Sequence, residues 1–213
     1  MLNIAQICPE THALGPGKRF VIWVQGCPFN CLGCVAPDWI PRRINHLTPV
    51  DDLVDRITAI PGLEGITISG GEPMLQPEGL ATLLRRVRTV RPGMSAIAFT
   101  GFTLEQLRRK ALSEPALNDF LDQLDVLIDG LYRAELNDGR GLRGSSNQRV
   151  HFLTSRYEHL REEFEDRRRD VELHVLRDEM LMVGVPSSES LQTFRSLVRQ
   201  VKQSKDCASA VDQ

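Results

Sequence analysis

Three closely spaced cysteines are the residues of this sequence best suited to chemistry. Cys27, Cys31 and Cys34 follow the pattern C-x3-C-x2-C, in a stretch that glycine and proline interrupt and that is therefore predicted to be a loop. Soft thiolates bind iron–sulfur clusters or zinc. A structural zinc ion takes four ligands, and His46, twelve residues after Cys34, is a candidate for the fourth. Three thiolates on a cubane cluster instead leave one iron open for a small molecule. We expect a redox-active cluster and keep zinc as the alternative.

The elements that must position this loop read as strands alternating with helices. Apolar, β-rich runs predict strands, and stretches with helical spacing of apolar residues lie between them. This alternation predicts an α/β fold with a mostly parallel sheet. The chain is short for a complete eightfold barrel, which takes about 250 residues, so an open or partial barrel fits better. The predicted strands cover residues 19–25, 65–69, 95–100, 124–128, 150–153 and 171–175.

Two helix starts carry capping signals. Thr48 followed by Pro49 predicts Thr48 as the N-cap and proline as the first helical residue. Thr103 with Gln106 is a capping-box pattern before another apolar stretch. Both predicted helices follow strands or loops that carry polar residues, as the alternating pattern requires.

Polar and glycine residues follow the predicted parallel strands at the points where these end. Cys27 follows the first strand, Gly70 to Pro73 the second, Thr100 the third and Asp129 the fourth. Ligands of open α/β sheets bind at the carboxyl ends of the strands. We therefore expect these residues to meet at one site.

Composition narrows the class of protein. The chain has 213 residues, 41% of them hydrophobic, with a formal net charge of −2 and a pI of about 6.2. We expect one domain over residues 1–203 and a polar tail over 204–213. There is no basic excess that predicts nucleic-acid binding, no apolar run of membrane-spanning length and no signal-peptide pattern. Five cysteines, three of them clustered, favour a cytoplasmic metal protein over a disulfide framework. Cys8 is expected to be a buried apolar residue and Cys207 a thiol of the tail.

Several further motifs accompany the cysteines in a fixed order, and with them the sequence resembles the radical S-adenosylmethionine enzymes. Within that superfamily it is similar to the activating enzymes of glycyl radical enzymes, particularly the branch that serves anaerobic ribonucleotide reductase. The resemblance spans roughly residues 14 to 186. The motifs are Gly15-Pro16-Gly17-Lys18-Arg19, Gln25-Gly26-Cys27-Pro28, Ser69-Gly70-Gly71-Glu72-Pro73, Thr100-Gly101-Phe102, Asp125 to Gly130, Arg143 to Arg149, and Val183-Gly184-Val185-Pro186.

The resemblance implies a partial (βα)6-type open barrel and a specific reaction. Cys27, Cys31 and Cys34 are expected to ligate three irons of one 4Fe–4S cluster, whose fourth iron binds the amino and carboxylate groups of S-adenosylmethionine. An external one-electron reductant, such as flavodoxin or ferredoxin, supplies the electron for cleavage. The resulting 5′-deoxyadenosyl radical is expected to abstract hydrogen from a protein partner, a glycyl radical enzyme such as anaerobic ribonucleotide reductase.

The resemblance also implies which residues hold the cofactor. Gly33 and Val35 are expected to contact the adenine through backbone atoms. Gly70 and Gly71 lack side chains, so that backbone can approach the cofactor closely. Glu72 suits the methionine ammonium, as the acceptor of a charge-assisted hydrogen bond. Thr100 is a further candidate for a hydrogen bond to the cofactor, with a plain helix-entry role as the alternative.

Other residues leave alternatives open. The polar run from Arg143 to Arg149 suits either a buried polar network or a surface that docks the partner, and Asp129 is expected to order this loop. Lys18 and Arg19 suit either structure or a cofactor carboxylate. Residues 157–179 match no motif and are a candidate for partner specificity.

Three functions remain in competition at this stage. The first is an activating enzyme that installs a glycyl radical. The second is a radical enzyme that modifies another protein, a peptide or a small molecule. The third is a non-enzymatic zinc or iron–sulfur binding module.

Overall fold

A seven-stranded sheet forms the centre of the computed structural model, which describes residues 1–176 and 179–209. The strand order is β3-β1-β2-β4-β5-β6-β7, and a separate hairpin pairs β8 with β9. The strands are β1 (Leu2–Thr11), β2 (Arg19–Val24), β3 (His46–Thr48), β4 (Gly65–Gly70), β5 (Ser95–Phe99), β6 (Val126–Asp129), β7 (Arg149–Phe152), β8 (Val171–Leu176) and β9 (Glu179–Gly184). The helices are α1 (Val50–Ala59), α2 (Pro77–Val90), α3 (Leu104–Ala111), α4 (Pro115–Leu121), α5 (Arg161–Glu165) and α6 (Ser188–Ser209).

The four central strands β2, β4, β5 and β6 run parallel, and β1, β3 and β7 extend the sheet with antiparallel pairs. The predicted α/β class with a mostly parallel central sheet is therefore confirmed. Crossover connections that contain helices join the parallel strands. The carboxyl ends of these strands therefore lie along the same edge of the sheet.

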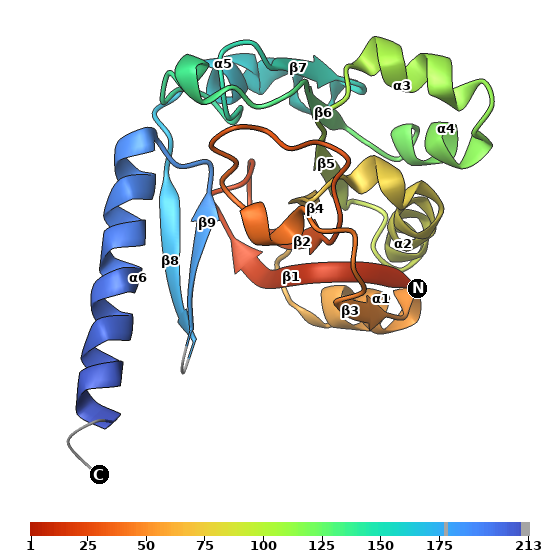
Figure 1. Ribbon diagram of the computed structural model, residues 1–213. Coiled ribbons are helices and arrows are strands. Elements are labelled where there is room, and N and C mark those ends of the chain that lie inside the picture. The colour runs from red at the N-terminus through yellow and green to blue at the C-terminus, as the bar shows by residue number, and fades with distance from the viewer. Residues whose placement is uncertain (177–178, 210–213) are drawn as a thin grey trace.

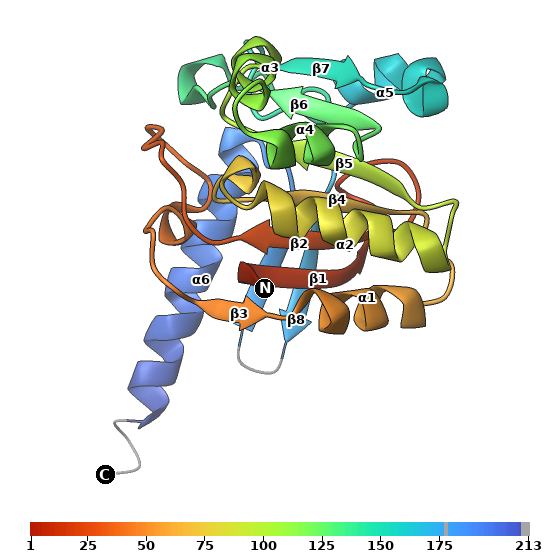
Figure 2. The same cartoon turned by 90° about the vertical axis from the view of Figure 1, so that its right-hand side faces the viewer.

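Each face of the sheet has its own apolar core, because alternate residues of a strand point to opposite faces. Phe20, Ile22 and Val24 of β2 pack under α1 and α2, whereas Val21 and Trp23 belong to the core on the opposite face. Figure 2 shows α1 and α2 in front of the sheet, with β8 and α6 behind it. Burial on both faces explains why the parallel strands are almost continuous apolar runs.

The β8–β9 hairpin and α6 lie beside the sheet (Figure 1), and Val183 of β9 is buried in the core on that face of the sheet. The helix begins close to the predicted amphipathic stretch and extends to Ser209, into the residues predicted as a tail. The side chain of Cys207 lies outside the described residues. No helix in the described part of the chain is long and apolar enough to cross a membrane.

The capping predictions had different outcomes. The capping box of Thr103 and Gln106 is confirmed, with both reciprocal hydrogen bonds present at the start of α3. The prediction for Thr48 was wrong by one residue. Pro49 is the N-cap of α1 and makes no side-chain capping bond, while Thr48 ends strand β3. The pairing of β3 with β1 holds Thr48 in extended backbone.

Candidate active site

The carboxyl ends of the four parallel strands meet around one cavity of about 170 Å³, where Gly130 marks the end of β6. The cysteine loop follows β2, Gly71 and Glu72 follow β4, and Thr100 follows β5. All predicted site residues except Gly33 line this cavity, which we call the cysteine cavity. Those residues are Cys27, Cys31, Cys34, Val35, Gly70, Gly71, Glu72 and Thr100.

The cysteine loop is irregular and is held by backbone hydrogen bonds. Cys27 N donates to Ile40 O over 2.9 Å, and Cys34 N donates to Cys31 O over 3.1 Å. The three thiols are free and half-buried. Burial raises the pKa of the Cys27 thiol to about 11 and also raises that of Cys31. Burial thus favours the protonated thiol at Cys27 and Cys31, and these two thiols must lose their protons when metal binds, since the thiolate is the ligand.

The donor set suits a cluster of several irons. In a 4Fe–4S cluster each cysteine ligates a different iron, so the sulfurs surround the cluster rather than one ion. Among the described residues, no three or more Cys, His, Asp or Glu side chains surround a single metal ion. His46, the proposed fourth zinc ligand, lies on edge strand β3, which pairs with β1. Three thiols that line one cavity are the donors that three corners of a 4Fe–4S cluster would take.

Glu72 is the buried carboxylate of the site, with 1% of its surface exposed. Its Oε1 accepts hydrogen bonds from Met74 N over 3.0 Å and from Thr100 Oγ1 over 2.8 Å, and its Oε2 accepts one from Gly101 N over 2.8 Å. Burial raises the pKa of Glu72 to about 6, although the three hydrogen bonds and Lys110 act in the opposite direction. A carboxylate has about four acceptor positions, so one remains for a ligand.

The paired glycines have a role that the sequence did not reveal. Gly71 N donates to Val24 O over 2.7 Å, and Glu72 N donates to Gly26 O over 2.8 Å. A Cβ on Gly71 would lie 2.2 Å from Gly26 O, and Gly70 has a φ of 106°. The glycines therefore allow the end of β4 to approach the end of β2. This contact places Glu72 beside the cysteine loop, in addition to any approach of backbone to a cofactor.

Gly33 and Val35 lie on either side of Cys34 but differ in position. Gly33 is exposed, has a φ of 76° and does not line the cysteine cavity. Val35 lines both the cysteine cavity and a larger neighbouring cavity. Of these two predicted adenine contacts, the structure therefore places only Val35 at the cavity.

The neighbouring cavity has a volume of about 430 Å³ and lies between the sheet, β9 and α6. Aromatic and apolar side chains dominate its lining, including Trp23, Trp39 and Phe194. Arg195 of α6 donates a hydrogen bond to Cys34 O over 3.5 Å. The two cavities share five lining residues, namely Cys34, Val35, Ser69, Gly70 and Phe99.

The polar loop from Arg143 to Arg149 divides into a buried inner half and an exposed outer half. Gln148 is buried, accepts hydrogen bonds from Gly144 N and Ser145 N, and donates one to Gly130 O over 2.6 Å. Ser146, Asn147 and Arg149 are exposed. The inner half is thus the predicted buried network, whereas the outer half lies at the surface, where Asn147 is held by hydrogen bonds to Leu131 O and Ser145 Oγ.

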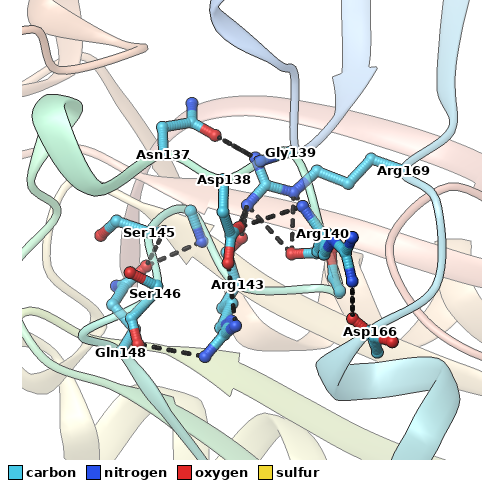
Figure 3. Close-up of polar contacts among 12 residues, drawn as sticks. Asn137, Asp138, Gly139, Arg140, Arg143, Ser145, Ser146, Gln148, Asp166 and Arg169 are labelled. Atoms are coloured by element: carbon cyan, nitrogen blue, oxygen red, sulfur yellow. Dashed lines mark hydrogen bonds and ion pairs between the residues drawn. The ribbon is translucent and has the colours of Figure 1, made fainter.

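Arg169 joins the unmatched segment 157–179 to this loop, as Figure 3 shows. Its buried guanidinium donates to Asn137 Oδ1 over 2.6 Å, to Pro186 O and to Arg143 O. It also forms an ion pair with Asp138. Part of the segment without a motif therefore serves to hold the polar loop in place.

Two expectations about polar residues change with the structure. Within the described residues, the Asp129 carboxylate has its polar partners outside the polar loop: it accepts a hydrogen bond from Leu104 N over 2.6 Å at the start of α3 and lies 2.8 Å from His151 Nε2. Arg19 is buried at the amino ends of the strands, opposite the cysteine cavity, and donates to Thr67 Oγ1 and Ser95 Oγ. Arg19 therefore has a structural role rather than a contact with the cofactor carboxylate.

Some residues of the cysteine cavity had no role assigned from the sequence. Phe29, Ile40, Phe99 and Tyr132 line it. Phe99 ends β5, so its place at a strand end was a usable signal. Tyr132 and Ile40 reach the cavity through loop conformations that no local pattern indicates.

The comparisons with known proteins agree with this site. Residues 13–151 of this chain match the model of the 4Fe-4S single cluster domain family. The anaerobic ribonucleoside-triphosphate reductase-activating protein of Escherichia coli K12 is 33% identical over 71% of this chain and 99% of its own length. The protein of that name from Vibrio cholerae is 34% identical over 72% of this chain and 99% of its own length. The pyruvate formate-lyase-activating enzyme of Staphylococcus epidermidis is 38% identical over 35% of this chain and 32% of its own length.

A cluster-binding cysteine loop at the strand ends of an α/β sheet, together with these relatives, defines the class of protein. The chain belongs to the 4Fe–4S single cluster domain family and, within the radical S-adenosylmethionine oxidoreductases, to the activating enzymes of the glycyl radical type. The alternative of a non-enzymatic binding module is set aside, because these relatives are named as activating proteins and enzymes.

Proposed function

We propose that this protein cleaves S-adenosylmethionine reductively at a 4Fe–4S cluster held by Cys27, Cys31 and Cys34. The 5′-deoxyadenosyl radical abstracts hydrogen from a glycyl radical enzyme of the anaerobic ribonucleotide reductase class. The observation that carries the proposal is the single cavity that contains all three thiols together with Glu72 and Thr100. The relatives support the target class, since they are named for activating the anaerobic reductase.

The chain's own residues divide the binding of the cofactor between the two cavities. Glu72 offers its remaining acceptor position to the methionine ammonium, and Thr100 and Gly101 fix the orientation of its carboxylate. Val35 lines the passage from the cysteine cavity to the apolar cavity, which we assign to the adenosyl group. When bound, the cluster supplies the electron for cleavage, and the surrounding apolar walls exclude water.

The proposed reaction also has consequences for the fold type, the reductant and the compartment of this protein. The four parallel strands, with the site at their carboxyl ends, support a partial open barrel of the (βα)6 type. The cluster needs an external one-electron reductant such as flavodoxin or ferredoxin. Ligation by three free thiols suits a reducing compartment, in keeping with the cytoplasmic location expected from cysteine usage.

The test is the formation of 5′-deoxyadenosine by the anaerobically reconstituted protein with reductant and S-adenosylmethionine. We expect product from the wild-type protein and none from Cys31→Ala. Cys8→Ala is the matched control, because Cys8 is buried on β1 and lines neither of the two cavities. The proposal is wrong if the wild-type protein carries a full cluster and yields no product. Stoichiometric zinc without iron or sulfide would favour a zinc site instead.

A further inference from the structure

A large polar groove extends away from the cysteine cavity, on the side of α3 and β7. Its volume is about 830 Å³, and its walls come from α3, from the loop after β6 and from β7. Phe29, Gly101 and Gly130 line both this groove and the cysteine cavity. The groove therefore leads to the place where we propose that the radical forms. We call it the arginine groove, after Arg108, Arg133, Arg149 and Arg161, which line it.

The charges of the arginine groove are unbalanced. Arg108, Arg133 and Arg149 are exposed, and within the described part of the chain their guanidinium groups have no hydrogen bond or ion pair. Arg161 is partnered by Glu165 over 3.1 Å. Glu105 is the exposed carboxylate among the lining residues. Three unpaired positive charges at one groove attract a negatively charged partner and raise its rate of encounter.

The floor of the groove includes a strand edge that is free within the described chain. β7 is the last strand of the sheet and pairs with β6 alone. Its four residues, Arg149 to Phe152, all line the groove. An exposed edge presents unpaired backbone groups to which an extended chain can add as a further strand. The occupant that fits is therefore a peptide segment rather than a small anion.

The inner end of the groove has a different character. Phe29 belongs to the cysteine loop, and Leu131, which also lines this end, is 41% exposed. Phe29 packs against Phe102 with ring centroids 4.8 Å apart, so its position is fixed. The groove thus changes from charged at its outer part to apolar where it meets the cysteine cavity. An apolar inner end suits a residue that must leave water to reach the radical.

We propose that the arginine groove binds an extended, acidic segment of the partner protein, which adds along β7 and directs one residue into the cysteine cavity. This inference rests on the proposed function and names the chemistry of its substrate segment. The exposed residues Asn147 and Arg149 of the polar loop are part of the contact surface. This gives the outer half of that loop a role that its buried half does not have.

The test measures the binding of two fluorescein-labelled peptides to the anaerobically reconstituted protein. One peptide has glutamates on both sides of a central glycine, and the other has glutamine in place of every glutamate. Exposed ion pairs are individually weak, and three of them together should favour the acidic peptide over the glutamine peptide by about tenfold in affinity. This preference should weaken as salt is added.

The variant Arg108→Gln/Arg133→Gln/Arg149→Gln should lose the preference for the acidic peptide. The matched control, Arg56→Gln/Arg85→Gln/Arg109→Gln, removes three exposed arginines that lie outside the groove and should keep it. Hydrogen exchange should show that the acidic peptide protects the backbone amides of residues 149–152. Thermal unfolding of both variants verifies that they are folded.

The outcomes separate this inference from the proposed function. Both triple variants should form 5′-deoxyadenosine at the wild-type rate when no peptide is present. Two results overturn the role of the arginine groove: equal binding of the two peptides, or a preference for the acidic peptide that survives in the groove variant. In either case the formation of 5′-deoxyadenosine continues, so the proposed function stands. Binding of the acidic peptide without protection of residues 149–152 overturns the addition along β7. Absence of product from wild-type protein with a full cluster overturns the proposed function instead.

Discussion

Replacement of Glu72 by glutamine tests the buried carboxylate to which we propose that the methionine ammonium binds. Glu72 accepts three hydrogen bonds, and its carboxylate is buried beside the cysteine loop. Glutamine has nearly the same shape but carries no charge, and its amide nitrogen is a donor. The nitrogen would face either Gly101 N or the pair formed by Met74 N and Thr100 Oγ1. The substitution therefore removes a titrating group and introduces a contact between two donors.

The structure sets the size and sign of the two effects. Burial raises the pKa of Glu72 from 4.5 in the unfolded chain to about 6 in the fold. Because the fold favours the neutral carboxyl, Glu72 makes its full contribution to the free energy of unfolding below pH 4.5. This contribution is lost as the pH rises through about 6. It amounts to about 2 kcal/mol, from 1.36 kcal/mol per pKa unit. The contact between donors costs about 1–3 kcal/mol and does not depend on pH.

The assay is urea unfolding of the cluster-free, reduced protein at a series of pH values. Between acid and neutral pH, the stability of Glu72→Gln should shift relative to wild type by about 2 kcal/mol in favour of the variant. Glu135→Gln is the control, because Glu135 is exposed, and its curve should parallel that of wild type. Parallel curves for Glu72→Gln and wild type would refute the assignment of a raised pKa to this carboxyl.

Three further substitutions test the scaffold of the site. Arg169→Ala should lower the free energy of unfolding by about 3 kcal/mol, because it leaves several buried acceptors unpaired. Arg169→Lys should recover only part of this loss. Urea unfolding of both variants measures the two changes. Gly71→Ala should prevent normal incorporation of iron, measured as iron and sulfide per chain, since the added Cβ would meet Gly26 O at 2.2 Å. Gly93→Ala should have little effect, as nothing lies within 4 Å of its added Cβ. Arg19→Met should lower the urea midpoint but leave unchanged the concentration of S-adenosylmethionine needed for half-maximal cleavage.

The sequence predicted the location of the site because the relevant signals are local. Apolar runs mark the buried parallel strands, and the polar residues that follow them necessarily gather at one edge of the sheet. The place of Glu72 and Thr100 beside the cysteine loop follows from that rule alone. β1 was not predicted, since its residues Leu2–Thr11 include a proline and several polar residues and lack the alternation of a clear strand.

The partners of individual polar side chains could not be predicted, because they depend on contacts between distant parts of the chain. Arg19 bonds to residues 48 and 76 positions away, and only the parallel register of β2, β4 and β5 brings them together. Asp129 is next to the polar loop in the sheet, yet its carboxylate caps α3. The split of the polar loop into buried and exposed halves likewise depends on the backbone of Gly130, which no sequence pattern reveals.

The central claim is that the cysteine cavity holds a cluster with one iron open to S-adenosylmethionine. Electron paramagnetic resonance of the reduced, reconstituted protein tests this most directly. A single reduced 4Fe–4S signal should change on addition of S-adenosylmethionine in the wild-type protein and in Cys8→Ala, and no such cluster signal should form in Cys31→Ala. A wild-type signal that is identical with and without S-adenosylmethionine would contradict the account.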